Sequence, residues 1–238
     1  MKVLDLSYHP LDVRSGRWLD LSRKSNHGTP HGGARPYMIA PGVMGFEFDG
    51  NSGYVDCGDD PSLNITDEIT IESWVNCVVE GKWDNLVGKG PRDNNLRWNL
   101  FWVPNNKIRF NLGDGDSAYY AWSDSALDIG KWYCIVGVYN RQHLRVFVNG
   151  VPQSIGDSFT GDIVSTAGYK LEIGQNGSYD FLNGLIGEVR IYNRALSADE
   201  IRENMYRSPI YRMLRGLPHS MIYTKVPWKQ TQGGIYVP

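Results

Sequence analysis

The sequence contains few cysteines and no long hydrophobic run, and these two absences exclude several classes of protein. The three cysteines, Cys57, Cys77 and Cys134, cannot all pair within one chain of 238 residues, so we predict reduced core residues and no disulfide scaffold. No segment reaches transmembrane length, and the first ten residues have no apolar run of the kind found in signal peptides. We therefore expect a protein that has no membrane partner and is made in the cytoplasm without a signal peptide.

An excess of charge of one sign is also absent, because 24 basic side chains nearly balance 26 acidic ones and the net charge is −2. The charges are unevenly distributed along the chain. The last 32 residues contain five basic side chains and no acid, so they sum to +5 and residues 1–206 sum to −7. An acidic main body does not favour a polyanionic partner, and we predict no nucleic-acid partner.

Turn-forming and aromatic residues are abundant. With 27 glycines, 12 prolines, 14 tyrosines and 8 tryptophans, the composition is typical of a β-sandwich and argues against a helical protein. Alternation with a period of two supports this interpretation, because residues 107–112 place Ile108, Phe110 and Leu112 on one face. The pair Asn149-Gly150 predicts a tight hairpin turn, since both residues tolerate positive φ.

A strand followed by a short helix is expected near residue 200. Residues 185–192 predict a strand in which Ile186 and Glu188 share one face. Ser197 and Glu200 have the spacing of a capping box, in which each side chain accepts a hydrogen bond from the other residue's backbone N–H. This spacing predicts one short C-terminal helix.

Several segments, taken in chain order, resemble those of LamG-like jelly-roll domains in the concanavalin A-like lectin and glucanase superfamily, which also includes laminin G and pentraxin folds. They are FEFDGNSGYV (46–55), DEITIESWV (67–75), GKWYCIVGVY (130–139), LRVFVNG (144–150) and the strand and helix start of residues 182–201. The resemblance covers residues 1–206 and implies an all-β, two-sheet antiparallel jelly-roll sandwich, in which residues 1–45 supply lead-in strands and loops.

The superfamily contains glycoside hydrolases, whose strand motif Glu-x-Asp-x-Glu places the acid and the nucleophile on one face. That motif is absent from this sequence. The nearest residues are Glu68 and Glu72, and Thr70 stands between them where the middle carboxylate belongs. We therefore predict no enzymatic activity and no catalytic residue, and we interpret the two glutamates as solvated strand carboxylates.

Related domains often hold a calcium ion where the first and last strands meet, and the resemblance implies such a site here. Asp49 is the matching carboxylate, Gly50 adds a backbone carbonyl, and Glu188 lies at the matching place on the last strand. The family commonly has Asp-Glu where this chain has Gly187-Glu188, so one carboxylate is lost. We expect one structural Ca²⁺ at Asp49, Gly50 and Glu188, and the competing interpretation is a plain turn aspartate.

Six aromatic residues are candidates for stacking on sugar rings in a lectin-like groove, which requires exposed flat faces beside polar donors. They are Trp83, Trp98, Trp102, Tyr119, Tyr120 and Trp122. The alternative is that these rings fill the core, since Trp98 and Trp102 alternate with Leu100 onto a common face.

Residues 207–238 predict an extended basic C-terminal arm. Its four prolines disfavour a helix, and its aromatic and basic residues are of the types that anchor interfaces. Its charge of +5 complements the acidic body, so we expect the arm to lie on a neighbouring copy or on an acidic shell protein. The alternative is that it wraps back across its own sandwich. The predicted interface residues are Arg207, Tyr211, Arg212, Arg215, Tyr223, Trp228 and Tyr236.

Two functions follow from the resemblance, because the superfamily includes exported carbohydrate-binding modules, adhesive domains, and surface or structural proteins of viruses. Our leading hypothesis is a non-enzymatic jelly-roll protein on the surface of a bacterial or archaeal virus particle, as a capsid decoration or appendage protein made in the host cytoplasm. We expect it to form homo-oligomers, or to bind a capsid or other assembly protein, through its arm. The alternative is a carbohydrate-binding, lectin-like module whose partner is a surface glycan.

Overall fold

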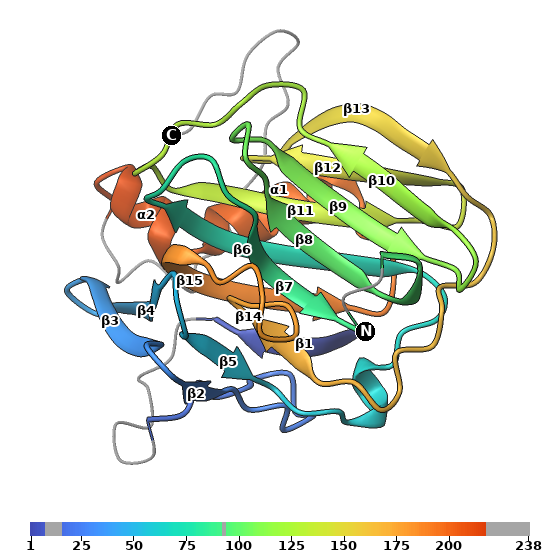
Figure 1. The fold of residues 1–238 in the computed structure, drawn as a ribbon. Coiled ribbons are helices and arrows are strands. Elements are labelled where there is room, and N and C mark those ends of the chain that lie inside the picture. Colours follow the sequence, from blue (N-terminus) through green and yellow to red (C-terminus); the bar gives the residue numbers. More distant parts are fainter. Residues whose placement is uncertain (8–15, 92–93, 218–238) are drawn as a thin grey trace, which may run out of the picture.

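The fold is that of a computed structural model, which describes residues 1–7, 16–91 and 94–217. Two antiparallel sheets pack face to face as a jelly-roll sandwich, and the predicted all-β fold class is confirmed (Figure 1). Two 3-10 helices, Pro61–Leu63 and Asn94–Leu96, lie in its connections. In the part of the chain that the structure describes, every helix is too short or too polar to cross a bilayer.

Within the described residues, the first sheet has eight strands. They are β1 (Lys2–Leu6), β3 (Arg35–Ala40), β4 (Val43–Asp49), β6 (Ile69–Cys77), β11 (Tyr133–Tyr139), β12 (His143–Val148), β13 (Val151–Ser158) and β15 (Asn183–Tyr192). Their order is β13, β12, β11, β6, β15, β4 and β3, and β1 also pairs with β15. The long strand β15 is central, because it pairs with β6 along one edge while β4 and β1 share the other.

The second sheet has seven strands in the part of the chain that the structure describes. They are β2 (Thr29–His31), β5 (Tyr54–Asp56), β7 (Asp84–Lys89), β8 (Trp98–Trp102), β9 (Ile108–Gly113), β10 (Ala118–Trp122) and β14 (Leu171–Ile173). Their order is β10, β9, β8, β7, β14, β5 and β2. In Figure 1, strands β7 to β10 lie in front of the eight-stranded sheet, so their outer face is turned toward the reader.

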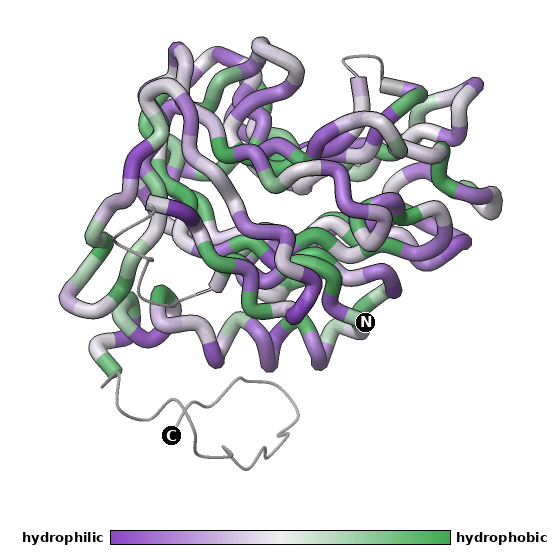
Figure 2. Tube along the Cα trace, turned by 90° about the horizontal axis from the view of Figure 1, so that it is seen from below, coloured by the Kyte–Doolittle hydropathy of each residue, from purple (hydrophilic) through white to green (hydrophobic). Residues whose placement is uncertain are grey.

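The main core lies between the two sheets. Alternate positions of the strands supply it, for example Ile71 of β6 and Phe110 of β9, both without exposed surface. Figure 2 shows hydrophobic and hydrophilic positions alternating along the chain, as strands with one buried face require. The three cysteines are buried and unpaired within the hydrophobic clusters, and burial raises the pKa of each thiol.

Two helices, α1 (Ala198–Arg207) and α2 (Pro209–Leu214), cover the outer face of the eight-stranded sheet. Their apolar residues pack on a second buried cluster, which joins Trp74 and Val136 of the sheet to Met205 of α1 and Ile210 of α2. The centre of this sheet is therefore buried on both faces, and α1 is partly hidden behind the strands in Figure 1.

Each helix begins at a serine cap. The Glu200 N–H donates to Ser197 Oγ at 3.2 Å and the Ser197 N–H donates to the Glu200 carboxylate at 3.0 Å, so the predicted capping box is confirmed. The Ile210 N–H donates to Ser208 Oγ at 3.1 Å. Pro209 occupies the first turn of α2, where its missing N–H has no intrahelical partner to lose.

The expected extended conformation of the arm is wrong for residues 209–214, which form α2. Ile210 and Tyr211 are buried in the second cluster, so a boundary after residue 206 cuts α1 before its last residue and separates it from α2, although both helices pack on the same sheet. A proline at the start of a helix is favourable, and only an interior proline breaks the hydrogen-bond ladder. The remaining arm residues, 218–238, lie outside the described part of the chain.

A β-bulge in β15 changes which side chains face the core. The register between β15 and β6 shifts by one residue between Ile186 and Glu188, so Gly187 is the extra residue. Ile186 consequently faces the main core with Val189, and the prediction that it shares a face with Glu188 is wrong. Gly187 also lies against α2, because a Cβ atom there would be 2.1 Å from Cδ1 of Ile210.

Candidate functional site

The outer face of strands β7 to β10 combines aromatic, amide and arginine side chains. In β9, Ile108 and Phe110 belong to the main core, so the alternating residues Arg109 and Asn111 face outward. The same alternation in β8 turns Phe101 outward. The pattern that builds the core therefore also builds this polar and aromatic face.

The strand register arranges the outward residues in two rows across the sheet. One row runs from Asn85 through Phe101 and Arg109 to Trp122. The other row runs from Gly88 through Asn99 and Asn111 to Tyr120. Directly opposed residues in antiparallel strands lie within about 5.5 Å of each other, so each row brings distant parts of the sequence into contact.

Arg109 lies at the centre of four aromatic rings. Its Cζ atom is 4.5 Å from the ring centroid of Trp83, 4.9 Å from that of Tyr120, 5.1 Å from that of Phe101 and 5.6 Å from that of Trp122. All four distances are within the range of cation–π attraction. We call these five residues the Arg109 cluster.

The Arg109 cluster is buried at its centre and open at its rim. Arg109 is 8% exposed and Phe101 is 1% exposed, whereas Trp83 and Trp122 are 37% and 40% exposed. Tyr120 is half-buried beside them. The rim therefore offers flat apolar rings next to hydrogen-bond donors, which is a combination suited to a small polar ligand with an apolar face.

Arg109 contacts aromatic rings, and no carboxylate of the described residues pairs with it. Within the described residues its side chain makes no hydrogen bond and no ion pair, and its Nε atom is buried without a partner. Burial lowers the pKa of Arg109, while the electrostatic effects of Tyr120 and Asp180 act in the opposite direction. A buried cation without a partner carries a desolvation cost that a bound anion would offset.

A row of buried amides borders the Arg109 cluster. Asn85, Asn99 and Asn111 have no exposed surface. Asn99 Nδ2 donates to Asn85 Oδ1 at 3.2 Å, and Asn85 Nδ2 donates to the Gln175 carbonyl at 2.5 Å. Gly88 leaves room for this row, because a Cβ atom there would lie 2.6 Å from Cβ of Asn99. These contacts fix the side-chain amides of Asn85 and Asn99 beneath this face.

The structure separates the six predicted sugar-stacking residues into two groups. One group lies on the outer face within the Arg109 cluster: Trp83, Tyr120 and Trp122. The other group faces the core: Trp98, Trp102 and Tyr119. Trp98 and Trp102 are at most 1% exposed, and Tyr119 stacks on Phe159 with ring centroids 4.3 Å apart. The prediction of a sugar contact is therefore wrong for Trp98 and Trp102, whose rings fill the sandwich. Tyr119 is half-buried against the core, and its hydroxyl donates to Asp114 Oδ2 at 2.9 Å.

Arg109 and Phe101 are not among the site residues predicted from the sequence. The alternation of each strand does indicate that they face outward. Arg109 lies between two apolar core residues of β9, and Phe101 lies between two apolar core residues of β8. The sequence does not indicate which strands are neighbours, however. The contact of Trp83 with Arg109 depends on β8 lying between β7 and β9.

The expected calcium ligands do not come together. Glu188 lies beneath α2, where its carboxylate accepts from Arg190 Nη2 at 2.7 Å and from Ser208 Oγ at 3.1 Å. Asp49 is at the other end of the β15 pairing, opposite Asn183. Among the described residues, no group of three or more His, Cys, Asp or Glu side chains is arranged to hold a metal ion.

Asp49 instead closes a turn. Its carboxylate accepts from the backbone N–H groups of residues 51–53 at 2.8 to 3.1 Å. Burial acts to raise its pKa, but these hydrogen bonds hold the pKa of Asp49 well below its usual value. The Gly50 carbonyl accepts from Lys82 Nζ at 3.1 Å. Because an ammonium group contacts the carbonyl that was expected to bind calcium, the three residues do not fit the ion.

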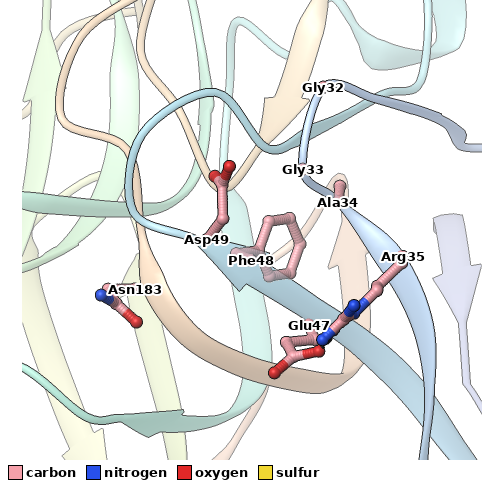
Figure 3. A pocket seen from close by; sticks show the side chains of 8 residues that line it. All are labelled: Gly32, Gly33, Ala34, Arg35, Glu47, Phe48, Asp49 and Asn183. Carbon is pink, nitrogen blue, oxygen red and sulfur yellow. Dashed lines mark hydrogen bonds and ion pairs between the residues drawn. The ribbon is translucent and has the colours of Figure 1, made fainter.

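An open hollow of about 360 Å³ lies beside Asp49, between β3, β4 and the start of β15 (Figure 3). Arg35 and Glu47 lie side by side in it, and Arg35 Nε donates to Glu47 Oε2 at 2.6 Å. The Asp49 carboxylate is turned toward Gly33, where a Cβ atom would lie 2.0 Å from Oδ2. Since the charged groups of this hollow contact partners within the chain, we assign no ligand to it.

The two glutamates nearest to a hydrolase motif do not form an accessible pair. Glu72 is 3% exposed beneath α1, and Asn204 Nδ2 donates to both of its carboxylate oxygens at 3.0 Å. Burial raises the pKa of Glu72, although Arg190 acts to lower it. Glu68 accepts from the Ala195 N–H at 3.1 Å. The prediction that Glu72 is a solvated carboxylate is therefore wrong.

Four of the predicted interface residues fall in the described part of the chain: Arg207, Tyr211, Arg212 and Arg215. Tyr211 and Arg212 are only 7% and 9% exposed, so their own domain covers them. Arg207 pairs with Glu203 of α1, and Arg215 Cζ lies 5.5 Å from the Tyr211 ring centroid. This segment follows the alternative prediction, in which the arm packs on its own sandwich. The other three residues, Tyr223, Trp228 and Tyr236, lie outside the described residues.

Comparisons with known proteins agree with this architecture. A family model described as the concanavalin A-like lectin/glucanases superfamily matches residues 49–202, which is more than half of the chain. No curated protein matches the sequence. Domain 4 of AbnA, a GH43 extracellular arabinanase from Geobacillus stearothermophilus solved in complex with arabinotriose, is similar with a TM-score of 0.67. It is 20% identical, and the match covers 85% of this chain and 97% of that one.

Binding domains of botulinum neurotoxins have the same fold. That of serotype G is 17% identical with a TM-score of 0.65, and the match covers 87% of this chain and 51% of that one. That of neurotoxin DC, solved in complex with SialylT, is 15% identical with a TM-score of 0.62, and the match covers 86% of this chain and 50% of that one. The chain thus spans about half of the neurotoxin domains. Taken with the two-sheet sandwich, the match over residues 49–202 leads to the conclusion that this chain belongs to the concanavalin A-like lectin/glucanases superfamily.

Proposed function

We propose that this chain is a non-enzymatic glycan-binding domain whose binding surface is the Arg109 cluster. The observation that carries the proposal is the pair of exposed indoles, Trp83 and Trp122, on a rigid sheet face around one buried arginine. A sugar ring has an apolar face that stacks on an indole and hydroxyl groups that accept from a guanidinium.

The sheet supports this function by holding the site ready. Phe101, Arg109 and Trp122 occupy one row of paired strands, and the neighbouring amides are hydrogen-bonded beneath the surface. A ligand therefore meets side chains whose conformations are already fixed, and binding loses little side-chain entropy. A site on paired strands is also more precisely positioned than one on a loop.

Two relatives in fold support the proposal. Domain 4 of AbnA was solved with arabinotriose, and the binding domain of neurotoxin DC was solved with SialylT. Ligand recognition of this kind, without the paired carboxylates of a hydrolase, is the role that we infer for this chain. Attachment to a virus particle through the arm stays a prediction. The arm residues 218–238, which include three of the predicted interface residues, lie outside the described part of the chain.

A glycan microarray tests the proposed function. The purified chain should bind a defined set of glycans, and Trp122→Ala should abolish that binding because it removes a stacking ring at the rim. Tyr37→Ala is the matched control, since Tyr37 of β3 is a similarly exposed aromatic residue, at 39%, on the other sheet. The proposal fails if the wild type binds no glycan, or if Trp122→Ala and Tyr37→Ala retain binding equally.

A further inference from the structure

The Arg109 cluster contains a buried positive charge for which the described residues supply no anion. The contrast with Arg190, on the eight-stranded sheet, is direct. Arg190 contacts Glu188 at 2.7 Å and lies 3.5 Å from Asp5 and 4.0 Å from Glu72. Within the described residues, one buried arginine thus pairs with three carboxylates, whereas Arg109 contacts four aromatic rings and forms no ion pair.

We propose that the ligand of the Arg109 cluster is an acidic glycan, whose carboxylate or sulfate group forms an ion pair with Arg109. This inference rests on the proposed function and names the class of sugar that the same face binds. The exposed aromatic rings at the rim stack on the sugar ring, and Arg109 binds its acidic group.

The geometry of the guanidinium fits this assignment. Among its nitrogens, only Nε is buried without a partner, so the terminal N–H groups reach the solvent side of the cluster. Aromatic rings cover the faces of a guanidinium and leave its edge, where the N–H groups point, for hydrogen bonding. A carboxylate matches that edge with two parallel hydrogen bonds.

An acidic ligand compensates the buried charge, whereas a neutral one does not. Hydroxyl groups can accept from Arg109, but they leave its net charge unbalanced in a site of low dielectric. Asp180 has an electrostatic effect on Arg109, but it accepts from Asn176 Nδ2 at 3.3 Å and forms no ion pair with Arg109. Within the described residues, no carboxylate forms an ion pair with the terminal nitrogens of Arg109, so an anionic ligand would supply the missing counter-charge.

Matched ligands test the inference without altering the protein. The probes are lactose, 3′-sialyllactose and lactose 3′-sulfate, which share a neutral core, together with tetragalacturonate and its methyl ester. At least one acidic probe should bind about ten- to a hundredfold more tightly than its neutral counterpart, because a charge-assisted pair replaces a neutral hydrogen bond. Binding should weaken as salt is added. The sialylated and sulfated probes separate a carboxylate from a sulfate preference.

Two variants test whether the preference for acidic probes depends on Arg109. Arg109→Gln should bind acidic and neutral probes alike, and Arg109→Lys should keep part of the preference because it retains the charge and loses the fork. Thermal melting checks that each variant is folded. If Arg109→Gln does not fold, the comparison of acidic with neutral probes on the wild type decides alone.

The outcomes separate the two proposals. Equal binding of an acidic probe and its neutral counterpart overturns the acidic-ligand inference and leaves glycan binding intact, as does a preference that survives in Arg109→Gln. Failure of every acidic and neutral glycan to bind, on the microarray and among these probes, overturns the proposed function and this inference with it.

Discussion

The guanidinium carbon of Arg109 lies 4.5 Å from the ring centroid of Trp83, although the two residues belong to segments separated by β8. The indole shields a buried charge on one side and remains 37% exposed on the other. One ring therefore stabilises the site and also forms its surface. The proposed binding function depends on this double role.

Two tryptophan substitutions should separate binding from stability. Trp83→Phe removes a rim indole and should weaken glycan binding by roughly tenfold with little change in melting temperature. Trp102→Phe shrinks a core side chain that is 1% exposed, so it should lower the free energy of unfolding by about 1–3 kcal/mol and leave affinity unchanged. Titration calorimetry and thermal melting measure the two effects, and equal loss of affinity in both variants contradicts the division of the aromatic residues.

Removal of calcium should not change the stability of the domain. Lys82 Nζ contacts the Gly50 carbonyl, and Glu188 is paired with Arg190 far along β15 from Asp49. Because these groups are already partnered, a chelator should leave the melting temperature unchanged across a range of concentrations. A ligand that bound only the folded state would raise the melting temperature as its concentration increased. A drop on chelation that added calcium reverses would therefore refute this prediction.

Two truncations should differ sharply. Ending the chain after Tyr206 removes α2 and exposes the cluster that Ile210 and Tyr211 cover, so the free energy of unfolding should fall by at least about 3 kcal/mol. Ending it after Leu217 keeps both helices and should leave the sandwich close to its full stability. Denaturant unfolding compares the two chains. If both melt like the full-length protein, α2 is not part of the domain.

Asp84 should make stability depend on pH. It has no exposed surface, and burial raises the pKa of Asp84 from 3.8 to about 7, although Lys82 at 3.4 Å acts to lower it. The folded state then holds this proton more tightly than the unfolded state, so its contribution to stability is present below about pH 4 and is lost as the pH rises to about 7.

Asp84→Asn replaces the titrating carboxyl with a neutral amide. The change in the free energy of unfolding between pH 4 and pH 8 should then be smaller than in the wild type by an amount on the order of 3 kcal/mol. Denaturant unfolding of the wild type and the variant between pH 4 and pH 8 provides the measurement. Asp56→Asn is a control for the same chemical change at another aspartate, which is partly exposed and paired with Lys170 at 2.6 Å. An identical slope in wild type and Asp84→Asn would show that Asp84 does not titrate in this range.

The fold was predictable because its signals are local. Alternation in residues 107–112 and the capping box at Ser197 depend on neighbouring residues, and both occur in the structure. The bulge at Gly187 was not predictable from alternation, because it comes from pairing with β6 and from the approach of Ile210. The helix at residues 209–214 contradicts the prediction because Pro209 stands at the helix start, where proline is favourable, and not in the interior, where it breaks a helix.

The site was predictable only in part. Trp83, Tyr120 and Trp122 are aromatic residues that composition alone brings to notice, whereas Arg109 becomes central only when β8 and β10 flank β9. The side chains on one face of a sheet come from different strands, and the sequence of a single strand does not determine which strands lie beside it. The same limit applies to Glu188, whose burial beneath α2 depends on a helix later in the chain.

Nuclear magnetic resonance of the tryptophan indole N–H groups tests the central claim most directly. The chain has 8 tryptophans, of which Trp83 and Trp122 lie in the Arg109 cluster while Trp98 and Trp102 lie in the core. Titration with a glycan that binds should shift the indole signals of Trp83 and Trp122 and leave those of Trp98 and Trp102 in place. Unchanged Trp83 and Trp122 signals in the presence of a bound glycan would contradict the assignment of the binding site to this face.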